Sequence, residues 1–246
     1  MPLAYRYALY LAPAEPWRRA GAQWLGRCPD TGLLLPPSAD ADPRQPGWTA
    51  DPRHYGLHAT LKPPFRLRAG RTPDSLDDAV LCLAAIAEPF SVQLECQALR
   101  GFLAWRLAGD AGEQAPMLSL AAEAVRQLDG WRAPPTEAEL ARRRGSPLSP
   151  QHEAMLERWG YPYVFEHFTF HITLTGRLDG PEMQDAQARI RAFSDPLCRT
   201  PMPVRDISLY VQPEPGAPFL VARHYGFDGT VADGAAAGYL QGPAAP

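Results

Sequence analysis

Apolar and polar residues alternate along residues 56–65, and this alternation predicts a strand with two unlike faces. Neighbouring side chains of a strand point to opposite sides, so every second residue shares a face. His58, Thr60 and Lys62 share the polar face, and the apolar residues between them share the other. We therefore expect this strand to pack on a core and to present a His-x-Thr-x-Lys face on its other side.

Residues 165–178 repeat this pattern and are predicted to form the strongest strand of the chain. His171, Thr173 and Thr175 share its polar face, whereas phenylalanine, isoleucine and leucine side chains occupy the opposite face. The sequence therefore contains two strand faces that each carry His-x-Thr.

Helices and hairpins are predicted around these two strands. A strand is expected at 5–11 and a long loop at 28–51, and the hairpins are expected at 90–107 and 204–225. Apolar spacing, capping residues and prolines predict helices at 16–24, 72–86, 116–128, 136–144, 149–160 and 181–193. A histidine strand, a helix and a hairpin thus follow one another twice along the chain.

This repeated order predicts an α+β fold with two similar antiparallel-sheet lobes, flanking helices and a central cleft. We expect one domain over residues 1–228, with lobes at roughly 1–115 and 116–228. Residues 229–246 are rich in alanine and glycine and are expected to form a disordered tail.

Charge and cysteine content narrow the class of protein. The formal net charge of -3 disfavours an extended nucleic-acid partner, whereas a small phosphorylated metabolite needs only a local positive patch. Lys62 is the only lysine, and Arg142, Arg143 and Arg144 are expected on a solvated helix face. The four cysteines are scattered without a C-x-x-C pair, and no apolar run suits a signal peptide or a membrane span. We expect a cytoplasmic protein without a membrane partner.

Two converging His-x-Thr faces suit the hydrolysis of a phosphodiester. His58 and His171 titrate in the neutral range, so one can activate the attacking oxygen while the other protonates the leaving oxygen. Thr60 and Thr173 can donate hydrogen bonds to the non-bridging phosphate oxygens, and Lys62 would add positive charge. Further candidate substrate contacts are Tyr10, Arg66 and Thr175.

A metal site is the main chemical alternative. His54 precedes His58 by four residues, and His167 precedes His171 by four residues. Helical H-x-x-x-H can bind zinc, but both pairs lie in predicted loop or strand, and no H-E-x-x-H occurs. We therefore expect neither a metal nor another cofactor.

The paired motifs resemble those of the two-histidine (2H) phosphoesterase superfamily. The closer resemblance is to an uncharacterised phosphonate-metabolism branch associated with carbon–phosphorus lyase operons. It rests on stretches at residues 5–10, 55–65, 136–144, 159–165 and 170–176. The resemblance implies a bilobal fold with a pseudo-twofold axis and a metal-independent site. It also implies that His58, Thr60, His171 and Thr173 are catalytic.

Three functions remain open from the sequence. The first is hydrolysis of a small cyclic phosphate, such as a ribose 1,2-cyclic phosphate in phosphonate breakdown. The second is an RNA 2',3'-cyclic phosphodiesterase or ligase-like activity, and the third is non-catalytic binding of a phosphorylated metabolite. The acidic balance of the chain disfavours the second function, and the two histidines disfavour the third.

Overall fold

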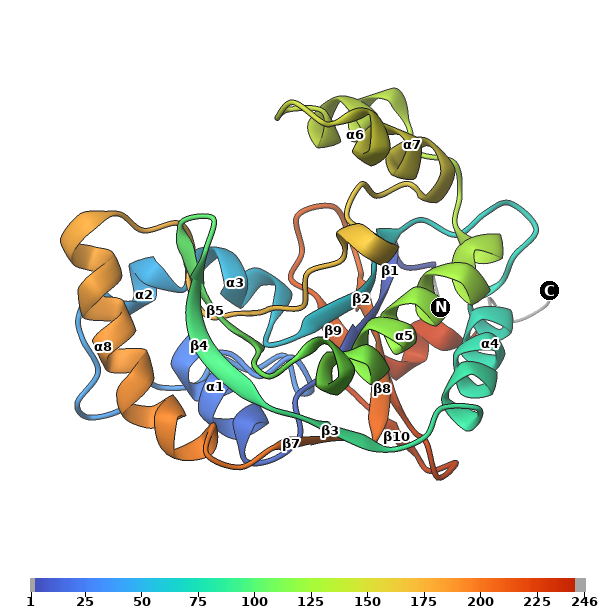
Figure 1. Cartoon of the computed structure of the whole chain (residues 1–246). Coiled ribbons are helices and arrows are strands. Elements are labelled where there is room, and N and C mark those ends of the chain that lie inside the picture. The colour runs from blue at the N-terminus through green and yellow to red at the C-terminus, as the bar shows by residue number, and fades with distance from the viewer. Residues whose placement is uncertain (1–2, 242–246) are drawn as a thin grey trace.

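Eight strands form one antiparallel sheet at the centre of the protein (Figure 1). The computed structural model describes residues 3–241, and its α+β architecture confirms the predicted fold class. In spatial order the strands are β10 (Val231–Asp233), β9 (Leu220–Gly226), β8 (Asp206–Gln212), β1 (Arg6–Leu11), β2 (Ala59–Phe65), β6 (Ile172–Thr173), β5 (Phe102–Leu107) and β4 (Leu94–Leu99). A separate small sheet pairs β3 (Phe90–Val92) with β7 (Met202–Val204).

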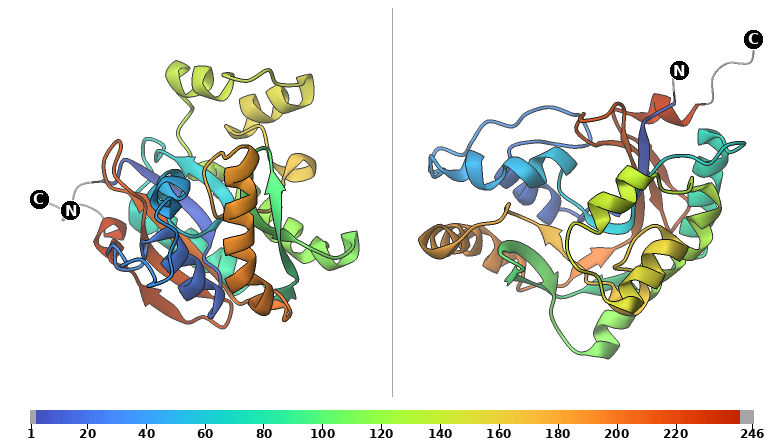
Figure 2. Two further views of the ribbon diagram at one scale, coloured as in Figure 1. Left: turned by 90° about the vertical axis from the view of Figure 1, so that its left-hand side faces the viewer. Right: turned by 90° about the horizontal axis from the view of Figure 1, so that it is seen from above.

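Helices surround the sheet, and two of them stand out from its body (Figure 2). The helices are α1 (Trp17–Leu25), α2 (Gln45–Trp48), α3 (Ala50–Tyr55), α4 (Pro73–Ala85), α5 (Ala111–Leu128), α6 (Glu137–Arg143), α7 (Pro150–Trp159) and α8 (Gly180–Leu197). Short 3₁₀ turns occur at Asp129–Trp131, Phe165–His167 and Ala237–Leu240. The two helices that protrude from the body of the sheet are α6 and α7. Between residues 3 and 241, no helix has both the length and the apolar character needed to cross a membrane.

The sheet separates a large core from a small one. On β1, Tyr7, Leu9 and Leu11 enter the large core with side chains of α1, α4, α5 and α8. Ala8 and Tyr10 point to the opposite face and join a small cluster with side chains of β8 and the β8–β9 region. The alternation along the strand therefore leaves most of the second face available for a site.

The strand pairing does not follow the expected division of the chain near residue 115. The β4–β5 hairpin follows β2 in sequence but pairs with β6, and the β8–β9 hairpin follows β6 but pairs with β1. Each hairpin thus lies beside a strand from the other half of the sequence: β4–β5 beside β6, and β8–β9 beside β1. The two halves of the sheet are interleaved, and β2 and β6 meet at its centre.

Local signals in the sequence place the helix ends correctly. Thr72 and Thr136 cap α4 and α6 through capping boxes, and Ser149 caps α7. Gly160 ends α7 in the left-handed conformation with φ 73°. These ends are set by hydrogen bonds between residues close in sequence, so the sequence pattern predicts them well.

Several predicted segments differ from the structure. The expected loop 28–51 contains α2 and the start of α3, α5 begins at Ala111 rather than at 116, β2 begins at Ala59 rather than at 56, and β3 pairs with β7 outside the expected hairpin 90–107. The expected strand 165–178 is reduced to Ile172–Thr173, because the amides of Leu174 and Thr175 both donate to the Leu103 carbonyl and leave the regular ladder. The expected disordered tail contains β10, which pairs with β9, and a turn that buries Leu240. Residues 242–246 of that tail lie outside the described residues.

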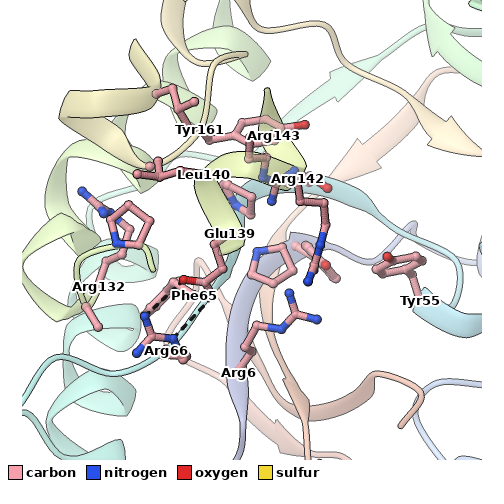
Figure 3. Close-up of a pocket in the computed structure, with 18 of the residues that line it drawn as sticks. Arg6, Tyr55, Phe65, Arg66, Arg132, Glu139, Leu140, Arg142, Arg143 and Tyr161 are labelled. Atoms are coloured by element: carbon pink, nitrogen blue, oxygen red, sulfur yellow. Dashed lines mark hydrogen bonds and ion pairs between the residues drawn. The ribbon is translucent and has the colours of Figure 1, made fainter. Parts of the chain in front are cut away.

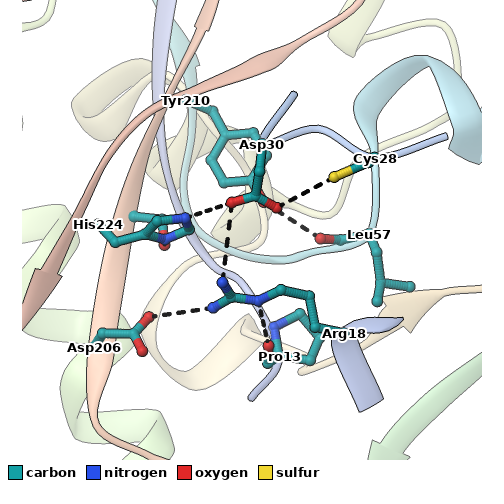
Figure 4. A network of polar contacts seen from close by, with 9 residues as sticks. Pro13, Arg18, Cys28, Asp30, Leu57, Asp206, Tyr210 and His224 are labelled. Carbon is teal, nitrogen blue, oxygen red and sulfur yellow. Dashed lines mark hydrogen bonds and ion pairs between the residues drawn. The ribbon is translucent and has the colours of Figure 1, made fainter. Parts of the chain in front are cut away.

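A polar network ties the segment after α1 to β8 and β9 (Figure 4). Asp30 accepts a hydrogen bond of 2.5 Å from His224 Nε2, and His224 Nδ1 lies 2.7 Å from Ser208 Oγ. Arg18 lies 3.9 Å from Asp30 and 4.0 Å from Asp206. Ser208 is fully buried. This serine–histidine–aspartate row therefore holds the fold together rather than presenting a nucleophile.

Candidate active site

The two His-x-Thr motifs lie on neighbouring strands. Ala59 of β2 pairs with Ile172 of β6 in antiparallel register, and both residues are fully buried. One residue further in either direction, this register sets the histidine of one motif opposite the threonine of the other. The four side chains that share the partly exposed face are His58, Thr60, His171 and Thr173.

Both histidines are oriented by the same local contact. His58 Nδ1 lies 2.9 Å from the Gly56 carbonyl, and His171 Nδ1 lies 2.8 Å from the Thr169 carbonyl. A carbonyl oxygen only accepts, so Nδ1 carries the proton in each ring. Each Nε2 is therefore left to exchange a proton with a ligand in the cleft.

Gly56 sets the position of His58 through its backbone. It ends α3 with φ 76°, a conformation that favours glycine. A Cβ atom at this position would approach the Pro29 side chain to 2.8 Å. The sharp turn and the close contact together direct the Gly56 carbonyl toward the His58 ring.

Burial favours the neutral form of both histidines. It lowers the pKa of His58 to about 4, against a raising effect of the Gly56 hydrogen bond, and His171 lowers it slightly further. Burial also lowers the pKa of His171, where Arg100 and Arg106 act in the same direction. A positive charge on His171 would thus further disfavour protonation of His58.

Aromatic rings enclose His58. The Tyr10 ring stacks on it with 3.8 Å between centroids and 20° between planes, and Tyr55 lies 6.2 Å away. Tyr10 lines the cleft but is only 1% exposed. Its placement supports the orientation of His58 and leaves little of its surface for the expected contact with substrate.

A cavity of about 320 Å³ opens in front of His58 and is rich in arginine (Figure 3). His58, Thr60 and Thr173 line its floor on the sheet, and α6 and α7 supply much of the opposite wall. Its charged lining residues are Arg6, Arg66, Arg132, Glu139, Arg142 and Arg143. The cavity therefore carries an excess of positive charge in a protein whose net charge is negative.

A smaller cavity of about 130 Å³ adjoins His171 and is mostly apolar and aromatic. Thr60, Pro63 and Tyr161 line both cavities, so the two spaces meet beside the first motif. Phe102 lies 5.8 Å from the His171 ring. Other apolar residues lining this cavity include Leu61, Val125, Tyr163, Phe165 and Phe168.

The structure does not bring Lys62 to the cleft. The pairing of β1 with β2 shifts register between Thr60 and Lys62, and this irregularity ends the simple alternation of faces. Lys62 is 1% exposed, and its Nζ donates to the Val125 carbonyl at 3.1 Å and to Asp129 at 3.3 Å. The prediction that Lys62 shares the face of His58 is therefore wrong.

Thr175 and Arg66, two of the expected substrate contacts, differ in their position relative to the cleft. Thr175 is fully buried, and its hydroxyl accepts the Leu103 amide at 2.9 Å, so it does not face the cleft. Arg66 lines the arginine-rich cavity, where its guanidinium pairs with Glu139 at 3.1 Å. Only Arg66 of these two candidates lies where a ligand can reach it.

The sequence pattern missed the contribution of α6. Arg142 and Arg143 line the cavity, whereas Arg144 pairs with Glu153 of α7. Glu139 and Leu140 line the same wall, one turn before Arg143. This i, i+3, i+4 spacing is a weak signal for a helix face that covers a site.

The two further histidines do not assemble a metal site. His54 lies on α3 beside Tyr55 and Phe219. His167 lies in a 3₁₀ turn, with its ring 4.3 Å from that of His152. In the described part of the chain, no three or more His, Cys, Asp or Glu side chains are grouped so that they could hold a metal ion.

Comparison with known proteins identifies the family. Residues 60–220 match the family model described as "Protein of unknown function (DUF1045)". Two similar curated proteins are both named "Ribose 1,5-bisphosphate phosphokinase PhnN". The protein from Janthinobacterium sp. (strain Marseille) is 35% identical over 243 residues, covering 91% of this chain and 51% of the relative. The protein from Laribacter hongkongensis (strain HLHK9) is 37% identical over 227 residues, covering 89% and 51%. The chain thus spans about half the length of these relatives, and it belongs to the DUF1045 family.

Proposed function

We propose that the protein is a metal-independent phosphodiesterase of the two-histidine type that opens a small cyclic phosphate. One observation carries the proposal: His58 and His171 directly precede the adjacent strands β2 and β6, and the Nδ1 atom of each is hydrogen-bonded to a carbonyl. Two imidazoles with free Nε2 atoms on one face can act on the two sides of a phosphorus atom.

We assign the roles of general base and general acid to different histidines. The strongly lowered pKa of His58 keeps its ring neutral, so we assign it as the base that takes a proton from water. The water oxygen bonds to phosphorus as the ring P–O bond breaks, and His171 in its protonated form gives a proton to the leaving oxygen. Thr60 and Thr173 donate hydrogen bonds to the charge on the non-bridging oxygens. His58 then releases its proton to solvent, and His171 takes one up from solvent.

A ribose cyclic phosphate is the substrate class that we favour. The two relatives are named for a phosphokinase activity on ribose 1,5-bisphosphate. Hydrolysis of a ribose 1,2-cyclic phosphate at the bond to O2 leaves a phosphate monoester on C1, which is one of the two phosphates of that compound. This relation agrees with the resemblance to phosphonate-metabolism proteins.

The phosphokinase activity in the relatives' name is less well supported for this chain. A P-loop needs a lysine directly after glycine and before serine or threonine. The only lysine, Lys62, lies between Leu61 and Pro63 and bonds to Asp129 in the structure. Since the chain matches about half of each relative, the name describes a longer protein than the region compared.

A nucleoside 2',3'-cyclic phosphate is the second candidate substrate. The aromatic cavity beside His171 favours it, because nucleic-acid bases stack on aromatic side chains. An RNA end would place its terminal base there and its cyclic phosphate between the histidines.

A hydrolysis screen separates these candidates. The purified protein is assayed with ribose 1,2-cyclic phosphate, with nucleoside 2',3'-cyclic phosphates and with a cyclic-phosphate-ended oligonucleotide. A parallel assay follows phosphoryl transfer from ATP to ribose 1,5-bisphosphate, the compound in the relatives' name. We expect the ribose ester to have the highest kcat/KM. A tenfold advantage of the oligonucleotide, about 1.4 kcal/mol, would favour the RNA activity, and hydrolysis of none of the esters would overturn the proposal.

A further inference from the structure

Three arginines in the large cavity differ from the other two in their charged contacts. Arg6 of β1 and Arg142 and Arg143 of α6 line this cavity, yet none forms an ion pair with any carboxylate of residues 3–241. Arg66 and Arg132 in the same cavity differ, because Glu139 and Asp129 pair with them. The uncompensated charge is therefore concentrated on three residues from two elements.

Neutral contacts hold two of these guanidinium groups. Arg6 Nε donates to Gln212 Oε1 at 2.8 Å, and its guanidinium lies 5.9 Å from the Phe219 ring centre. The Arg143 guanidinium lies 4.7 Å from the Tyr161 ring centre. Such contacts orient a guanidinium without neutralising it, and its other N–H groups remain available for an anion.

Arg6 and Arg142 reach into the same space from opposite walls. Figure 3 shows the Arg142 side chain descending from α6 toward Arg6, which rises from the strand below. The ion pair between Arg66 and Glu139 links this helix to β2 and its following segment. The two walls thus form an anion-binding space beside the floor that carries His58 and Thr60.

The amount of charge exceeds what the reacting ester needs. A cyclic phosphodiester carries one negative charge, and the two histidines and two threonines can already bind it. A terminal phosphate monoester carries about 1.5 to 2 negative charges near pH 7. Arginine is suited to such a group because its planar N–H groups bind phosphate oxygens in pairs.

We propose that Arg6, Arg142 and Arg143 form a second subsite, which binds a terminal phosphate monoester on the same substrate molecule. This inference rests on the proposed phosphodiesterase function. It deepens that function, because the substrate becomes a ribose that carries a cyclic phosphate and a separate terminal phosphate. Opening the cyclic ester at the bond to O2 then gives a ribose with two phosphate monoesters, which is the class of compound in the relatives' name.

Paired substrates test the subsite. Ribose 1,2-cyclic phosphate and its 5-phosphorylated form are compared in the wild-type protein and in Arg6→Gln, Arg143→Gln and Arg144→Gln. Arg144 is the matched control, because it adjoins Arg143 but pairs with Glu153 outside the cavity. We expect each of the first two variants to lose about ten- to hundredfold in kcat/KM on the 5-phosphorylated ester. The loss on the 5-phosphorylated ester should exceed the loss on the unphosphorylated ester by about tenfold or more in both variants, whereas Arg144→Gln should stay close to wild type on both esters.

Binding of ribose 5-phosphate gives a readout that needs no turnover. Calorimetry on the wild-type protein should detect binding that weakens in Arg6→Gln and Arg143→Gln and persists in Arg144→Gln. If neither ester is hydrolysed but this pattern holds, the phosphodiesterase proposal fails and the subsite stands. If both esters react equally well, or if ribose 5-phosphate binds all variants alike, the subsite is refuted. Arg6 and Arg143 lie on different elements, β1 and α6, so the same loss in both variants would not be explained by misfolding of one element.

Discussion

The His58 and His171 sides of the cleft share one local design but differ in their surroundings. Each histidine bonds to the carbonyl two residues before it and is followed by a threonine on the same face. The first histidine stacks on Tyr10 and faces the arginine-rich cavity, whereas the second borders an apolar, aromatic cavity. The repeated motif thus supplies the same chemical groups twice, and the unrepeated neighbours give the two sides different charge and polarity.

Removing either imidazole tests whether both sides take part in the reaction. We expect His58→Ala and His171→Ala each to lower kcat by about a hundred- to ten-thousandfold, because each removes a positioned acid or base. Both side chains are only partly buried, so the fold should survive, and circular dichroism and thermal melting check this. Near-wild-type turnover by either variant would exclude the paired mechanism.

Replacing the threonines tests how alike the two sides are in binding phosphate. We expect Thr60→Val and Thr173→Val each to lower kcat/KM by about ten- to hundredfold, since each removes a hydrogen bond to a charged oxygen. Steady-state kinetics on the best substrate of the screen measures both variants. A large loss in one variant and none in the other would show that the phosphate binds to one motif alone.

The pH profile distinguishes the roles of the two histidines. The base must be neutral and the acid protonated, so kcat/KM should rise as His58 loses its proton near pH 4 and fall as His171 loses its own. Because the pKa of His171 is lowered, we expect the maximum between pH about 4 and about 6.5. His58→Gln should remove the acidic limb and His171→Gln the basic limb. The opposite assignment of limbs would exchange the two roles.

Replacing Lys62 should change activity only slightly. Its ammonium is buried against Asp129 and the Val125 carbonyl, and Lys62 lines neither cavity. We expect Lys62→Met to keep kcat/KM within about threefold of wild type while lowering the free energy of unfolding by about 1–3 kcal/mol. Asp129 keeps its contact with Arg132, which limits the loss. A selective collapse of activity without loss of stability would contradict this structural role.

Addition of EDTA should leave turnover unchanged, because the proposed mechanism uses only side chains. The expected rate is the same before and after chelation and after addition of divalent metal. A loss on chelation that zinc or magnesium restores would point to a metal bound by the cleft histidines.

Alternation predicts the centre of the site because it depends only on neighbouring residues. The face shared by His58 and Thr60 is present in the structure, as is the face shared by His171 and Thr173. The same rule fails for Lys62, where β1 imposes a register shift that no local pattern on β2 reveals. Pairing between distant strands decides such irregularities, so a single strand cannot predict them.

Contacts that composition and capping signals do not reveal explain two further features of the fold. Capping residues locate α6 well, but its place above the cavity depends on the ion pair between Glu139 and Arg66, 73 residues apart. The composition after residue 229 suggests disorder, yet β9 offers an edge on which Val231–Asp233 pair. The position of α6 is thus set by a partner far away in the sequence, whereas β10 forms by pairing with the strand directly before it, which composition alone does not reveal.

The interleaved order of the strands has a consequence for biosynthesis. β1 pairs with β8, and Arg6 lies opposite Gln212 in this pairing. One edge of β1 therefore stays unpaired until β8 has been synthesised. Topologies dominated by such distant pairings fold slowly, because long loops must close before their contacts form. A nascent chain that has reached only β6 already carries both histidines but lacks β8 and β9. We therefore expect the cleft to become competent for binding only late in synthesis, which leaves partly made chains unable to hold the ligand.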